Sequence, residues 1–171
     1  MQRKVVNSHL PDLIPDGQKS LFMLVLIALL TACGHQPVFY GFQSAPDKGW
    51  SRTDTLVFSP EISDSGKTYS VFAEVRCFSS YAYEHLGLKY SYAPTQGKVM
   101  LQDTVFFWFR EGDGSWTKDG LAGLRFFTIP LRPLSAPETG KYDIKIVQNQ
   151  TDSLLGGIFD VGIKILPAES H

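Results

Sequence analysis

Cysteine is scarce in this sequence, which has only two among its 171 residues, Cys33 and Cys77. Two cysteines exclude a framework of several disulfide bonds and a zinc site built from four thiolates. The chain does not need either, because the part beyond residue 32 is long enough to bury roughly 68% of its surface on folding. Packing alone is therefore expected to stabilise one domain.

An excess of charge of one sign is also missing, since 16 lysines and arginines face 17 aspartates and glutamates. Proteins that hold a phosphate backbone need a basic patch or stripe, and the basic residues here form no block. Nucleic acid is therefore not expected as a partner.

Groups suited to catalysis are few. The sequence has four histidines and no Gly-x-Ser-x-Gly motif, whereas catalysis needs a nucleophile with a base, or paired carboxylates, in one pocket. His85 beside Glu84 is the one plausible base, and a surface or strand-edge histidine is the favoured interpretation. We predict no catalytic residue and no cofactor, and the chain is not expected to be an enzyme.

In the loop at residues 111–114, two acidic residues, Glu111 and Asp113, alternate with two glycines. Closely spaced carboxylates and glycine turns suit calcium, but the further acidic ligands of an EF-hand loop are missing. A solvated turn is favoured, so no metal site is predicted.

No apolar run is long enough to cross a membrane as a helix. The longest, residues 21–30, has ten residues and would rise about 15 Å, while a hydrocarbon core is about 30 Å thick. It follows Lys19 and has the dimensions of the hydrophobic region of a signal peptide. A buried core helix is the alternative, although no amphipathic period or cap accompanies the run.

The signal-like run ends in Leu30-Thr31-Ala32-Cys33, which resembles the bacterial lipobox. This resemblance implies that residues 1–32 are cleaved and that the Cys33 thiol carries diacylglycerol, with acyl chains such as palmitate. An ordinary secretory signal without lipid remains the alternative. Because a lipidated Cys33 cannot form a disulfide, Cys77 would be the only free thiol, and we expect it to be a buried small hydrophobe.

Beyond the signal, the composition favours strands and turns, with 13% aromatic residues, 15 glycines and 10 prolines. We expect residues 33–49 to be the lipidated cysteine and a tether, and residues 50–167 to form a single antiparallel β-sandwich, jelly-roll or Ig-like. The fold class is thus all-β. The predicted strands span 54–58, 67–78, 86–92, 99–110, 125–131, 141–149 and 158–166.

Side-chain patterns within these runs predict burial. Alternation gives the last two strands one solvent-facing side each, with Asp160 and Lys164 on that side of the last strand. The run 105–109 is apolar on both faces, which favours a buried Trp108. A core position is also favoured for Trp116 and Tyr83.

Several short motifs recur in a recognisable order along the predicted domain. They are Trp50 with Asp54-Thr55; Tyr69 and Arg76; Tyr81-Ala82-Tyr83-Glu84-His85-Leu86; Asp103-Thr104; Gly114-Ser115-Trp116 with Gly120-Leu121; Gly140-Lys141-Tyr142; Gln148; and the run 155–163, which includes Gly157, Asp160 and Gly162. By their order and spacing over about residues 39–165, the chain resembles the gliding motility lipoprotein GldH family of the Bacteroidetes. It departs from the family pattern at His85 and at Asn149-Gln150.

The resemblance implies an outer-membrane lipoprotein associated with the gliding machinery. We expect a non-enzymatic protein, anchored by lipid at the periplasmic face of the outer membrane, that docks other envelope or motility proteins. The rival hypothesis is a surface carbohydrate-binding lipoprotein, because exposed aromatic side chains can stack on sugars. The candidates for such stacking are Trp50, Trp108, Trp116, Tyr81 and Tyr83.

Overall fold

The computed structural model describes residues 36–46 and 48–168. The predicted signal segment, residues 1–32, and the predicted lipidation site Cys33 lie outside the described residues. Within the described part, all regular secondary structure is β. None of it is a helix long and apolar enough to span a bilayer.

The strands range from two to twelve residues and are closely spaced along the chain. Their bounds are β1 (Phe39–Ser44), β2 (Trp50–Ser51), β3 (Leu56–Phe58), β4 (Glu61–Ile62), β5 (Lys67–Phe78), β6 (His85–Pro94), β7 (Leu101–Trp108), β8 (Gly120–Leu121), β9 (Leu124–Pro130), β10 (Leu134–Ala136), β11 (Gly140–Gln148), β12 (Leu154–Leu155) and β13 (Ile158–Pro167).

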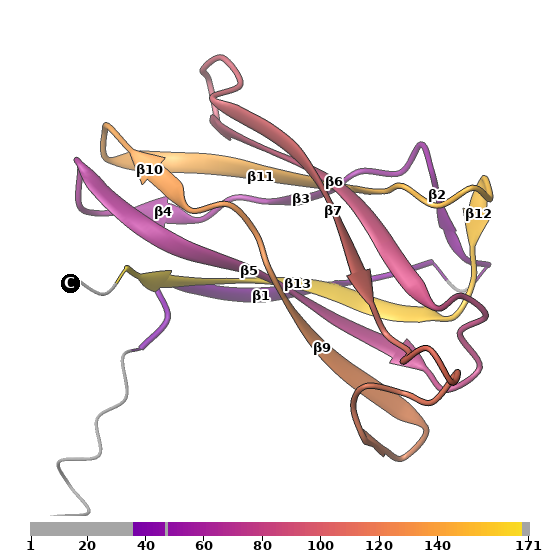
Figure 1. Cartoon of the computed structure of the whole chain (residues 1–171). Helices are drawn as coiled ribbons and strands as arrows, with labels where there is room; N and C mark the ends of the chain where they lie inside the picture. The colour runs from indigo at the N-terminus through magenta and orange to yellow at the C-terminus, as the bar shows by residue number, and fades with distance from the viewer. Residues whose placement is uncertain (1–35, 47, 169–171) are drawn as a thin grey trace, which may run out of the picture. The chain divides into compact units, whose positions relative to one another are not determined.

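Two antiparallel sheets face each other in the described domain (Figure 1). Sheet 1 has the order β1-β13-β5-β9-β8, and β10 pairs with β5 beside β9. Sheet 2 has the order β3-β11-β6-β7, and β4 also pairs with β11. A two-stranded ribbon of β2 and β12 lies at the end of the sandwich where β1 ends.

The strand order identifies the type of sandwich. Counting β1, β3, β5, β6, β7, β9, β11 and β13 as strands one to eight, sheet 1 runs 1-8-3-6 and sheet 2 runs 2-7-4-5. This interleaving of early and late strands is the double Greek key of a jelly roll, and it differs from the strand order of an Ig-like sandwich. The predicted antiparallel β-sandwich is confirmed, and it takes the jelly-roll form.

The core lies between the two sheets and follows from alternation along the strands. In β11, Tyr142, Ile144 and Ile146 are buried while Lys145 is exposed, as the pattern predicts. Stacking of Phe109, which follows β7, on Phe127 of β9 joins the two sheets, with ring centroids 3.9 Å apart. Each fully buried phenylalanine contributes about 1.5–3 kcal/mol, so contacts of this kind hold the layers together.

Part of the predicted tether is a strand. Residues 39–44 form β1, which pairs with β13 from Phe39 opposite Ile165 to Ser44 opposite Asp160. Pro37, Gly41 and Pro46 give this segment the composition of a linker. Its residues nevertheless pair with β13 and form the edge strand of sheet 1. The domain therefore begins before residue 50.

The prediction of a solvent-facing Asp160 was wrong. The residue is 2% exposed, because β13 lies in the interior of sheet 1, between β1 and β5. Its neighbours in the register are Ser44 of β1 on one side and Arg76 of β5 on the other. A buried carboxylate needs a partner, and that partner defines the first feature of the candidate site.

Candidate functional site

The outer face of sheet 1 carries an ion pair between β5 and β13. Arg76 and Asp160 are directly opposite in the pairing register. The Arg76 Nε donates to Asp160 Oδ1 at 2.6 Å, and the Nη2 donates to Oδ2, so the contact is bidentate. The hydrogen bond to Asp160 raises the pKa of Arg76 above its usual value.

Aromatic rings frame this ion pair. The Arg76 guanidinium carbon lies 4.5 Å from the centroid of the Phe42 ring and 5.4 Å from that of Phe159, within the range of cation–π attraction. Phe42 lies across Gly162, where an added β-carbon would come within 2.7 Å of the ring. Gly162 therefore provides the space in which Phe42 packs onto the sheet beside Arg76.

Further aromatic side chains extend this surface, which we call the sheet 1 patch. The strand registers place its members on the outward side of β1, β5, β9 and β13. The patch consists of the Arg76–Asp160 pair and the aromatic residues Tyr40, Phe42, Phe72, Phe78, Phe126 and Phe159. Four of the rings, those of Tyr40, Phe78, Phe126 and Phe159, are between 39% and 56% exposed.

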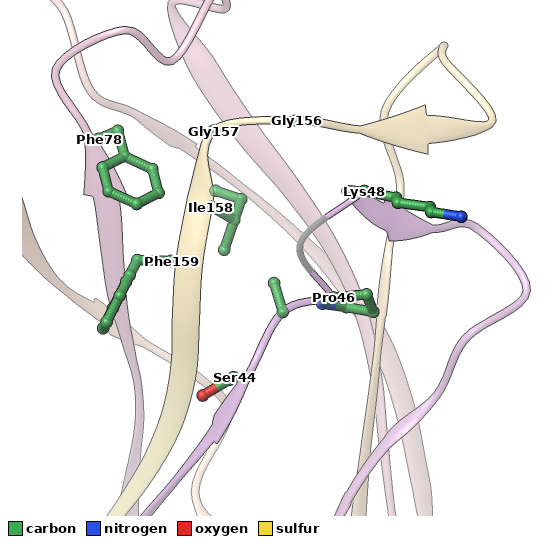
Figure 2. Close-up of a pocket in the computed structure, with 10 residues that line it drawn as sticks. Ser44, Pro46, Lys48, Phe78, Gly156, Gly157, Ile158 and Phe159 are labelled. Carbon is green, nitrogen blue, oxygen red and sulfur yellow. The ribbon is translucent and has the colours of Figure 1, made fainter.

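A pocket of about 370 Å³ opens at one end of the sheet 1 patch. Figure 2 shows Phe78 and Phe159 on one side of it and Pro46 and Lys48 on the other. Gly156 and Gly157 border the pocket, and Ile158 lies between its two sides. The pocket is thus continuous with the patch through two shared aromatic residues.

A buried polar network fills the same end of the sandwich. The Gln150 side-chain amide donates to the Tyr81 hydroxyl at 3.1 Å and to the His85 carbonyl at 2.6 Å. Gln148 accepts from the Gln150 backbone N–H at 2.7 Å and donates to the Asp152 carbonyl at 3.0 Å. Because the two glutamine side chains are buried and hydrogen-bonded, the network fixes the chain around them.

Gly157 and Trp50 also lie at this end of the sandwich. Gly157 has a φ of +84°, and an added β-carbon would lie 2.9 Å from the Tyr81 Cα, so only glycine fits. Trp50 is fully buried, and its Nε1 donates to the Asp54 carbonyl at 2.9 Å. The Asp54 side chain is exposed, so this residue acts here through its backbone.

The outer face of sheet 2 carries a second aromatic surface, which we call the sheet 2 patch. It consists of His85 of β6 with Phe106 and Trp108 of β7. The His85 ring lies 5.9 Å from Phe106 and 5.0 Å from Trp108. Phe106 packs over Gly87, where a β-carbon would be 2.8 Å from the ring.

The comparison with protein families is decisive, because the model of the GldH lipoprotein family matches residues 37–165. The chain belongs to the GldH lipoprotein family. Among curated proteins, it is 27% identical over 155 residues to a gliding motility lipoprotein GldH homolog of Christiangramia forsetii, covering 85% of this chain and 94% of that protein. It is 24% identical over 155 residues to the gliding motility lipoprotein GldH of Flavobacterium johnsoniae, covering 86% and 96%.

Solved structures resemble this GldH-family domain only weakly. An arabinofuranosidase has a TM-score of 0.38 at 16% identity, covering 74% of this chain and 19% of that one. A protein of infectious bursal disease virus, Gx strain, has a TM-score of 0.36 at 11% identity, covering 80% and 32%. The GldH-family chain thus spans a third or less of these larger proteins. The similarity to them does not indicate its function.

The structure separates the family-motif positions into two groups. Arg76, Asp160 and Gly162 meet in the sheet 1 patch. The second group lies at the end of the sandwich with the buried network; it comprises Trp50, Asp54, Tyr83, Gln148 and Gly157. Gln150 also lies in that network.

Trp116 stands apart from both groups. It is half-buried against the core, and the guanidinium carbons of Arg110 and Arg125 lie 4.1 and 4.6 Å from the centroid of its ring. Tyr83 is also half-buried and donates a hydrogen bond to the Asp152 carboxylate. Both side chains pack against the core, in line with the favoured prediction.

The expectation of a buried Trp108 was wrong, because its side chain is 58% exposed. Strand β7 is the edge of sheet 2, and only every second residue of the run 105–109 faces the core. Phe107 and Phe109 point inward, while Phe106 and Trp108 point outward. Sequence reasoning therefore missed the sheet 2 patch.

Cys77 and Asp113 lie outside both patches and the buried network. Cys77 is fully buried, as predicted, and burial raises the pKa of its thiol to about 12. The Asp113 carboxylate accepts from the Ser115 backbone N–H at 2.9 Å, which holds the loop in a turn. Hydrogen bonds to Ser115 lower the pKa of Asp113.

Among residues 36–46 and 48–168, no three acidic, histidine or cysteine side chains cluster as metal ligands would.

Proposed function

We propose that this chain is a non-enzymatic envelope lipoprotein that acts by docking other proteins of a motility assembly. In this proposal, lipid on Cys33 holds the β-sandwich at the periplasmic face of the outer membrane. The match of residues 37–165 to the GldH lipoprotein family carries the proposal. The lipobox-like sequence directly before the matched region supports it.

Acyl chains make such an anchor stable. Each buried CH₂ group contributes about 0.8 kcal/mol, and two chains hold a protein where one binds only reversibly. A protein confined to a surface meets neighbours at a high effective concentration, so modest contacts are enough for assembly.

The sheet 2 patch suits the docking step of this proposal. Trp108 and Phe106 are more than half exposed, and tryptophan is enriched among the residues that dominate binding energies at protein interfaces. Most of the patch lies on β7, which pairs only with β6 within the described residues. Its outer backbone groups can therefore pair with an added strand. A protein partner would thus find both an aromatic anchor and a strand edge.

Replacing Cys33 by serine tests the anchor. We expect Cys33→Ser to abolish incorporation of labelled palmitate and to leave the precursor uncleaved, because the peptidase acts on the lipidated cysteine. Mass spectrometry of the purified protein measures both changes. The matched control is Cys77→Ser, which should retain the lipid. Normal labelling of Cys33→Ser would refute the proposal.

Carbohydrate binding is the second candidate function, and the exposure of Trp108 favours it. An indole that lies open on a sheet face can stack on a sugar ring, as aromatic side chains commonly do. If this function holds, Trp108→Ala abolishes binding of the mature protein to a glycan array, while Phe126→Ala on the other sheet leaves it unchanged. Absence of binding by the unaltered protein would rule it out and leave protein docking as the role of the patch.

A further inference from the structure

The outer face of sheet 1 is unusually aromatic for a surface open to water. Its strands present four rows of outward residues, the first formed by Tyr40, Lys164 and Phe72. In the last row, Phe159 at the bulge of β13 contacts Phe78, with ring centroids 5.6 Å apart. Exposed apolar patches of this kind mark contact with another protein or with lipid. The position, charge and area of this face distinguish between these two occupants.

Position relates the sheet 1 patch to the predicted lipid. Tyr40 is seven residues beyond Cys33, and a chain extends at most about 3.5 Å per residue, so the two lie within roughly 25 Å. Tyr40 belongs to β1, the edge strand of sheet 1, so the patch begins where the tether ends. The remaining strands follow at intervals of about 4.8 Å. The whole face is thus close enough to the anchored residue to lie on the bilayer.

The charges of the patch are balanced. Arg76 is neutralised by Asp160, and Lys164 and Glu74 contribute one charge of each sign. The Glu74 carboxylate accepts a hydrogen bond from the Thr128 hydroxyl at 2.9 Å. Lys164 lies 6.0 Å from the Tyr40 ring, and long basic and tyrosine side chains place their polar ends in the headgroup layer. Because this face has no net charge, its contact with a bilayer does not require an excess of anionic lipid.

The area of the patch is small for a protein interface that this face alone would have to hold together. Four strands and four rows cover roughly 400 Å², about half of the 800 Å² that one partner contributes to a standard interface. A second copy of this chain would therefore bind weakly through this face. Contact with a bilayer does not require a large buried area, since the acyl chains already hold the protein in place.

We propose that the sheet 1 patch rests on the membrane surface, with its aromatic rings in the interfacial layer of the lipid. This inference depends on the proposed lipidation of Cys33. Aromatic residues are favoured at that depth because their rings are apolar and tolerate partial hydration. The sandwich then lies flat on the bilayer, and the sheet 2 patch faces away from it, toward partner proteins.

Spin labels on the mature lipidated protein test this orientation. The label is attached to Phe126→Cys in the sheet 1 patch and, as a matched control, to Phe106→Cys in the sheet 2 patch. Both positions are about half exposed. Cys77 does not react, because it is buried and its thiol pKa is about 12. The protein is placed in vesicles of phosphatidylethanolamine with phosphatidylglycerol, and in vesicles of phosphatidylcholine alone.

The measured quantity is the accessibility of each label to oxygen, which concentrates in lipid, and to a water-soluble nickel complex. We expect the label at position 126 to favour oxygen and the label at 106 to favour nickel, equally in both kinds of vesicle. Two labels that both favour nickel would overturn the proposal. A label at 126 that is shielded from both reagents would overturn it in favour of a protein occupant.

Vesicle flotation separates this test from that of the lipid anchor. If the mature protein fails to float with vesicles, the proposed lipidation is wrong and the proposed orientation fails with it. If it floats while the label at position 126 stays accessible to nickel, only the orientation is wrong. A Phe126→Ala variant should float as the unaltered protein does, since the acyl chains supply the attachment.

Discussion

Arg76→Leu should lower the free energy of unfolding by about 3 kcal/mol, because it leaves the Asp160 carboxylate without a partner in a buried position. Only 4% of the Asp160 side chain is exposed, compared with 32% of the Arg76 side chain. The two halves of the ion pair are therefore not equivalent. Asp160→Leu should cost less than Arg76→Leu, since the freed guanidinium can still reach water. Urea unfolding of the soluble domain or the intact protein measures both changes.

The double variant Arg76→Leu/Asp160→Leu is the control for this prediction. Buried ion pairs replaced by apolar side chains of similar volume are often neutral in stability, so the double variant should be more stable than Arg76→Leu. Equal losses for the two single variants would contradict the proposed asymmetry. Additive losses in the double variant would contradict the energetic coupling of the two charges. That outcome would mean that the Phe42 and Phe159 contacts, rather than the charge pairing, dominate.

Much of the fold could be predicted from the sequence because long strands with one core face leave a clear alternation. The predicted run 67–78 coincides with β5, and the runs at 125–131, 141–149 and 158–166 agree with β9, β11 and β13 within one residue at each end. Strands of two or three residues, such as β2 and β12, are too short to show any period. The residues of β1 were missed for another reason, since glycine and proline around them resemble a linker.

The candidate surfaces were harder to predict. Arg76 and Asp160 are 84 residues apart in the sequence, and nothing in either local pattern indicates that they face each other. Family resemblance selected both positions but gave them no common role. In the run 105–109, outward-facing aromatic residues are indistinguishable from core residues, because both are apolar. Only the sheet order reveals that β7 has one open face.

The two open faces suggest a division of roles within one small domain. The sheet 1 patch begins at the strand that the predicted anchor precedes, whereas the sheet 2 patch lies on the opposite layer at an edge strand. A sandwich held flat through one face presents the other at a fixed height and orientation. Partners diffusing along the membrane would then meet the sheet 2 patch without a search over all orientations, which raises the rate of productive encounters.

Trp50→Ala should cost about 3–5 kcal/mol of stability, because it removes a fully buried indole and leaves a cavity. The substitution also removes the hydrogen bond from Nε1 to the Asp54 carbonyl. Trp50 pairs with Leu155 across the ribbon of β2 and β12, which lies next to Gly156 and Gly157. Loss of the indole should therefore loosen the end of the sandwich that carries the pocket.

Trp108→Ala provides a matched control, since it removes the same side chain from a position that is 58% exposed. Surface substitutions of this kind usually change stability by less than about 0.5 kcal/mol. Thermal unfolding of both variants, followed by near-ultraviolet circular dichroism, measures the difference. Similar midpoints for the two variants would show that the ribbon does not depend on Trp50. A large loss confined to Trp50→Ala would instead explain why this tryptophan begins the family motif, since it closes the sandwich at the end where the pocket and the buried network lie.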